Sequence, residues 1–118
     1  MTVPATGTEG RATPYPSTIF VSGVAGRIGD VSVTLNRLSH ADTRDVDILL
    51  VAPDGARMIL LSDAGTGHVV DSTITLSDQA LTLAPSGPLT ATRYRPTNYN
   101  SFGDPGDMFP APGSPKEL

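Results

Sequence analysis

The chain has 118 residues, the size of a single domain, and a formal net charge of −4. It contains no cysteine, which excludes a disulfide scaffold and any thiolate metal site. It also has no cluster of basic residues, so a nucleic-acid partner is not expected.

Its apolar runs are short. None approaches the ~20 residues that a membrane helix needs, and residues after Met1 lack the charged and apolar regions of a signal peptide. We therefore expect no membrane span and no signal peptide in this chain, which would be either a cytosolic protein or a fragment of a longer secreted one. Twelve glycines and eleven prolines indicate many turns, and the Val, Ile and Thr between them favour strands.

The N-terminal part predicts an extended lead-in followed by two strands. Residues 1–17 are rich in Thr, Pro and Gly, and residues 18–22 (TIFVS) predict a short strand. Residues 28–38 alternate, which predicts a strand with one face in the core and one in solvent. Its core face is expected to carry Val31, Val33, Leu35 and Arg37, and its mostly polar face Ile28, Asp30, Ser32, Thr34, Asn36 and Leu38.

The central stretch predicts a β-hairpin. Two apolar runs, residues 48–52 and 58–61, flank Pro53-Asp54-Gly55. Asp-Gly is a strong signal for a type I′ turn, because both central residues of that turn have positive φ. Runs this apolar are typical of strands covered on both faces.

Three more strands are expected after the hairpin, over residues 69–76, 80–84 and 89–94. Residues 101–118 have no structural period and many Pro and Gly, which predicts an exposed or disordered tail. Strands at this spacing indicate an all-β antiparallel sandwich or barrel.

Several motifs resemble one family. They are STIFVSG at 17–23, IGDVSVTL at 28–35, LSH at 38–40, DVDILLVAPDG at 45–55, LSDAG at 61–65, PSGPL at 85–89 and YRPTNY at 94–99. They resemble the P domain, or Homo B domain, of subtilisin-like proprotein convertases, and above all the bacterial P-domain-like modules. The resemblance covers about residues 4–112, so we expect a partial P-domain-like domain at 1–112 and a tail at 113–118.

The resemblance implies an antiparallel jelly-roll β-sandwich of the galactose-binding-domain-like type. The family's closing strands and their tryptophans have no counterpart here, so the C-terminal strands are expected to be missing. Such modules are non-catalytic accessory domains of extracellular or cell-surface proteins, where they stabilise or attach a neighbouring domain, often a subtilisin-like serine endopeptidase. The alternative is a stand-alone carbohydrate- or surface-binding module. No Gly-x-Ser-x-Gly elbow or phosphate loop is present, so no catalytic residue is assigned.

Calcium is the expected cofactor, with Asp45, Asp47 and Asp63 as metal ligands. Asp45 and Asp47 are two residues apart on one strand face, and Asp63 follows the return strand of the hairpin. The alternative is structural: turn residues at Asp45 and Asp63, and at Asp47 backbone hydrogen bonds or a pair with Arg44. Weaker candidates are Asp71, Asp104 and Asp107.

Two further sites can be considered. His40 and His68, with nearby aspartates, form a weak zinc candidate, against which His40 is a loop residue bonded to backbone. For a sugar, Tyr94 and Tyr99 are candidates for an aromatic platform. Its polar residues would be Arg93, Arg95 and Asn98. The alternative is that these tyrosines pack a loop against the sandwich.

Overall fold

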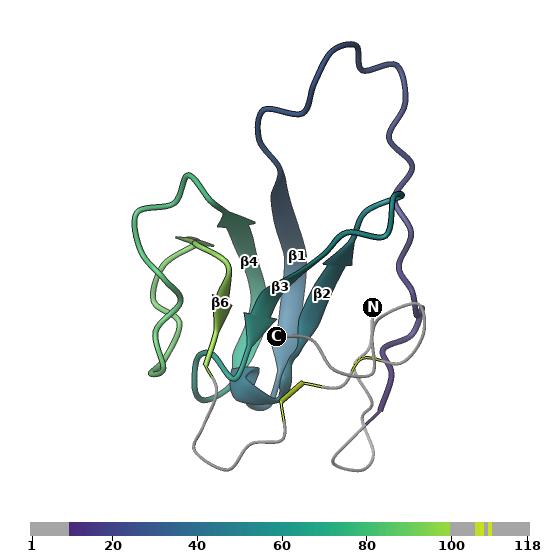
Figure 1. Ribbon diagram of the computed structural model, residues 1–118. Helices are drawn as coiled ribbons and strands as arrows, with labels where there is room; N and C mark the ends of the chain where they lie inside the picture. The colour runs from purple at the N-terminus through teal and green to yellow at the C-terminus, as the bar shows by residue number, and fades with distance from the viewer. Residues whose placement is uncertain (1–9, 100–105, 108, 110–118) are drawn as a thin grey trace. The chain divides into compact units, whose positions relative to one another are not determined.

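The computed structural model describes residues 10–99, 106, 107 and 109 (Figure 1). It has two compact units, Met1–Asp30 and Val31–Leu118. No helix in the described part is long and apolar enough to cross a membrane. The expected tail at 113–118 and the candidate Asp104 lie outside the described residues.

In the first unit, residues 18–22 do not form the expected strand. Ile19 and Val21 are each 79% exposed and Phe20 is 93% exposed. A strand requires a ladder of hydrogen bonds to a neighbour, and these residues have none among the described part of the chain. High β-propensity alone therefore did not produce a strand here.

The second unit is all-β, with two three-stranded sheets and one short 3₁₀ turn. Its elements are β1 (Ser32–His40), η1 (Thr43–Asp45), β2 (Ile48–Val51), β3 (Arg57–Ser62), β4 (Val69–Ser77), β5 (Arg93–Tyr94) and β6 (Thr97–Asn98). One sheet has the order β1-β4-β5 and the other β2-β3-β6. Both supply side chains to one core, the arrangement of a small β-sandwich.

β1 and β4 form an antiparallel pair with two irregularities in register. Arg37 in β1 and Asp71 in β4 both have positive φ, 57° and 51°. Each of these residues lies at one of the two register irregularities. A bulge inserts one residue and so inverts the alternation beyond it. Leu38, expected on the polar face, is therefore buried, while Arg37, expected on the core face, is exposed.

The predicted hairpin is confirmed, with β2 and β3 as an antiparallel pair. The turn, however, is not type I′, because Asp54 does not have positive φ and only Gly55 does (φ 90°). Gly55 N donates to Ala52 O at 2.9 Å and Ala52 N to Ala56 O at 2.8 Å. This is a three-residue loop with a left-handed glycine at its end, in which Pro53 supplies the fixed φ.

β2 is not covered on both faces as its apolar run predicted. Its first three residues are half-buried and Val51 is exposed, and within the described sheet it pairs on one side only. β3 is the more buried strand, because it lies between β2 and β6 (Figure 1).

The sheets are mixed rather than purely antiparallel. β5 pairs in parallel with β4, and β6 pairs in parallel with β3, so residues 93–98 cross from one sheet to the other. Residues 80–84 contribute only an isolated bridge, Leu83 to Arg95, instead of the expected strand. The strand expected at 89–94 is limited to Arg93–Tyr94.

The core lies between the two sheets. Its buried members are Leu38, Leu60, Leu61, Ala64, Ile74, Leu76, Ala84 and Tyr94. Two residues of the segment expected to be an exposed tail are also buried, Asp107 at 8% and Phe109 at 7% exposure. The tail prediction is therefore wrong at these positions, and Asp107 contacts the end of β3.

Candidate functional site

The most unusual polar arrangement is at Ser62, the last residue of β3. Ser62 is completely buried, and its hydroxyl lies 2.7 Å from Asp47 Oδ1 and 2.7 Å from Asp107 Oδ1. Asp47 directly precedes β2, and the β2–β3 hairpin brings it beside Ser62. Asp107 comes from 45 residues farther along the chain. Two carboxyl groups thus meet at one hydroxyl.

Proton counting shows that one hydroxyl cannot satisfy both contacts. Ser62 has a single O–H and can donate to one carboxylate at a time. The contact between the Ser62 oxygen and the second carboxylate oxygen, also at 2.7 Å, is attractive only if a second proton or a cation lies there. Like charges this close are otherwise unfavourable.

Two further oxygen atoms at this end of the sheet are buried. Asp107 Oδ2 and Asn98 Oδ1 have no hydrogen-bond partner among the described atoms. Asn98 pairs with Ser62 in the parallel β3–β6 ladder, which places both side chains on the same face of the sheet. A buried oxygen without a donor costs about 1–3 kcal/mol, so these atoms are suited to a positively charged ligand.

The other expected metal ligands have different surroundings. Asp45 is exposed at the end of η1, as Asp47 is before β2, but no contact of Asp45 with Ser62 is seen; Asp63 is half-buried after β3 with φ 52°. Asp71 forms an exposed ion pair with Arg37 at 2.6 Å. Within the described ranges, no group of three or more His, Cys, Asp or Glu side chains converges as a metal site would require.

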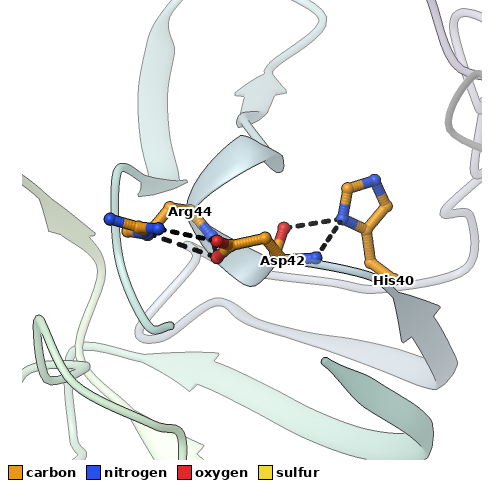
Figure 2. A network of polar contacts seen from close by, with 3 residues as sticks. All are labelled: His40, Asp42 and Arg44. Atoms are coloured by element: carbon orange, nitrogen blue, oxygen red, sulfur yellow. Dashed lines mark hydrogen bonds and ion pairs between the residues drawn. The ribbon is translucent and has the colours of Figure 1, made fainter. Parts of the chain in front are cut away.

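A second polar network lies at η1 (Figure 2). Arg44 Nη2 donates to Asp42 Oδ2 at 2.7 Å, and Arg44 N donates to Asp42 Oδ1 at 3.2 Å, so Asp42 caps the turn. These hydrogen bonds from Arg44 lower the pKa of Asp42 to about 2. The same pair raises the pKa of Arg44. Arg44 thus pairs with Asp42, whereas the sequence suggested Asp47.

His40 is held by backbone, as its structural interpretation predicted. Its Nδ1 lies 2.6 Å from Asp42 O and 3.3 Å from Asp42 N. Nδ1 would have to donate a proton to the carbonyl oxygen but accept one from the backbone N–H, and it cannot do both. The carbonyl oxygen is the closer atom and can only accept, so we assign the ring proton to Nδ1. Figure 2 shows His40 and Arg44 on opposite sides of Asp42. His68, the other half of the zinc candidate, is exposed.

The two tyrosines of the sugar-site candidate are structural. Tyr94 is 3% exposed, and its hydroxyl accepts from Ala91 N at 2.6 Å. Tyr99 packs against the core and donates from its hydroxyl to Ala84 O at 2.8 Å. Because both rings face the core, they do not form the aromatic platform that a sugar would need.

Sequence reasoning named Asp47 as a ligand but ranked Asp107 only as a weak candidate, and it did not name Ser62 or Asn98 for a metal. Asp107 lies in a Gly- and Pro-rich segment without periodicity. The one signal available was Phe109, an aromatic residue that favours burial and could have anchored this segment.

Comparisons with known proteins identify no relative. The chain matches no family model, no curated protein and no solved structure.

Proposed function

We propose that this chain is a non-catalytic, P-domain-like module of a secreted or cell-surface protein, and that it packs against a neighbouring domain. The jelly-roll arrangement that the sequence motifs imply belongs to this proposal. The antiparallel β1–β4 and β2–β3 pairs support it, because a sandwich of this kind is built from antiparallel pairs; the short parallel pairs β4–β5 and β3–β6 do not belong to that pattern.

The observation that carries the proposal is the exposed apolar segment of the first unit. Five large side chains are each more than three quarters exposed: Ile19, Phe20, Val21, Val24 and Ile28. Burying one side chain of this kind contributes about 1.5–3 kcal/mol. Large apolar side chains exposed together within ten residues of sequence are typical of a segment that contacts another protein. Packing against a neighbouring domain would remove it from water.

The neighbour we propose is a subtilisin-like protease domain, as the sequence motifs suggest. The experiment takes the domain encoded beside this chain, produced separately, and measures its thermal unfolding with and without the chain. Burial of several apolar side chains is expected to raise its Tm by about 5 °C or more. Phe20→Asp should abolish the increase, because it would bury an unpaired carboxylate.

Leu81→Asp is the matched control, since Leu81 is also highly exposed but lies in the second unit. It should leave the effect on the neighbour intact. An unchanged Tm with the wild-type chain would contradict the proposal. Binding of the wild-type chain to a glycan array, without any effect on the neighbour, would instead support a stand-alone carbohydrate- or surface-binding module.

A further inference from the structure

We propose that Asp47 and Asp107, together with Ser62 and Asn98, form a calcium-binding site at the end of β3. The ion would hold the segment around Asp107 against the β2-β3-β6 sheet. This inference does not depend on the proposed contact with a neighbouring domain, because none of the four residues belongs to the exposed apolar segment of the first unit.

Two carboxylates converge on the Ser62 hydroxyl. Asp47, which is exposed, and Asp107, which is buried, both lie 2.7 Å from the Ser62 hydroxyl, and Ser62 can supply a proton to only one of them. A divalent cation between the carboxylates would make both approaches favourable, with Ser62 then acting as a neutral oxygen ligand or as a donor to one of them.

Two buried oxygen atoms, on Asp107 and Asn98, point to a cation independently of the Ser62 contacts. Asp107 is more than nine-tenths buried, and its second oxygen, Oδ2, has no hydrogen-bond partner among the described atoms. Asn98 Oδ1, on the residue that pairs with Ser62 in the β3–β6 ladder, is also buried and has no hydrogen-bond partner among the described atoms. Burying an ionised carboxylate is strongly unfavourable without a compensating charge. A cation would supply that charge and would also satisfy the amide oxygen.

The chemistry of the donor atoms favours calcium. All four donors are oxygen atoms, from carboxylates, an amide and a hydroxyl, which are ligands of hard cations rather than of zinc. Calcium accepts six to eight such oxygens in flexible geometry, with backbone carbonyls and water completing the set. Magnesium demands stricter octahedral geometry and retains its water. With only two carboxylates, the site should be a low-affinity one.

The experiment is calorimetric titration of CaCl2 into the whole chain, freed of metal with a chelator, at neutral pH. We expect binding with a Kd of about 10⁻⁴–10⁻³ M, the range of extracellular modules. Asp47→Asn and Asp107→Asn should each weaken binding by about tenfold or more, because ligand charge sets the affinity. Asp45→Asn and Asp78→Asn, at exposed aspartates, are the controls and should bind as the wild type does.

A second measurement separates loss of binding from loss of folding. Asn98→Asp adds a third carboxylate and should tighten calcium binding by about tenfold, a gain that a misfolded protein would not show. In the wild type, about 10 mM calcium should raise Tm by about 5 °C or more. The amide NMR signals of Asp47, Ser62 and Asp107 should shift, while that of Asp78 should not.

Three outcomes would overturn the proposal. The first is the absence of both heat and a Tm increase with the wild type. The second is calcium binding that Asp45→Asn abolishes and Asp107→Asn does not. The third is a metal-free chain that becomes more stable on mild acidification and does not respond to calcium, which would mean that a proton joins the two carboxyl groups.

Discussion

At the scale of single residues, the closest constraint is between Gly65 and Thr43. Gly65 has φ 80°, and a Cβ at this position would meet the side chains of Thr43 and Leu89. Thr43 is fully buried and its backbone N donates to Gly67 O at 3.2 Å, while Gly65 N donates to Pro85 O at 2.7 Å. The loop after β3 is thus fixed against η1 from one side and the segment at Pro85 from the other.

Gly65→Ala should therefore destabilise the protein more than an equivalent change elsewhere in the same loop. The left-handed conformation costs about 1–2 kcal/mol for a residue with a side chain, and the contact with Thr43 adds to it. We expect a loss of about 3 kcal/mol in the free energy of unfolding, measured with urea. Gly67→Ala is the control, because Gly67 has a similar φ of 77° but open space around it. Equal losses in the two variants would contradict the steric argument.

The pair Asp42–Arg44 gives a prediction for pH. The pKa of Asp42 is lowered from 3.8 to about 2, first by the side-chain hydrogen bond from Arg44. Because the folded-state pKa lies below the unfolded value, this pair contributes stability above pH 3.8, and the contribution is lost as the pH falls toward 2. Arg44→Gln should return the pKa of Asp42 toward 3.8, as read from the NMR titration of its carboxyl carbon. Arg95→Gln should leave it unchanged, because Arg95 is not among the groups that lower it.

At the scale of elements, β1 and β4 explain where sequence patterns were sufficient and where they failed. The alternation correctly placed Val33 and Leu35 toward the core. It failed at Leu38, because Arg37 lies at a bulge and adopts positive φ. Arginine is not a residue that signals this conformation. The bulge depends on the pairing of β1 with β4, which is not visible in either strand alone.

β3 carries the largest share of buried side chains in its sheet, with Leu60, Leu61 and Ser62 all buried in succession. Leu61 is 1% exposed, so Leu61→Ala should cost about 2–5 kcal/mol of the free energy of unfolding by leaving a cavity in the core. Leu81→Ala makes the same chemical change at a side chain that is 97% exposed, and should change stability by less than about 0.5 kcal/mol. Urea denaturation of both variants checks the comparison; similar losses would mean that β3 is not central to the core.

At the scale of the whole molecule, the β class and the hairpin were predictable because they rest on local signals, namely β-branched residues and Pro53-Asp54-Gly55. The mixed sheets were not, because parallel pairing joins residues far apart in sequence. The same reason applies to the site. Asp47 is marked by the strand that it precedes, whereas Asp107 meets Ser62 only through a contact across 45 residues.

The crossing of residues 93–98 between the two sheets has a consequence for how the protein reaches this structure. During synthesis, β1, β2, β3 and β4 leave the ribosome before β5 and β6, so the β2–β3 hairpin and the β1–β4 pair that encloses it can form first. The strands that tie one sheet to the other arrive last. Until then the two sheets are joined by their apolar inner faces, by η1 and by the loop after β3, in which Gly67 O accepts from Thr43 N. The nascent chain is therefore most vulnerable to aggregation and proteolysis just before Asn98 emerges, and a chaperone that binds apolar segments would act in that interval.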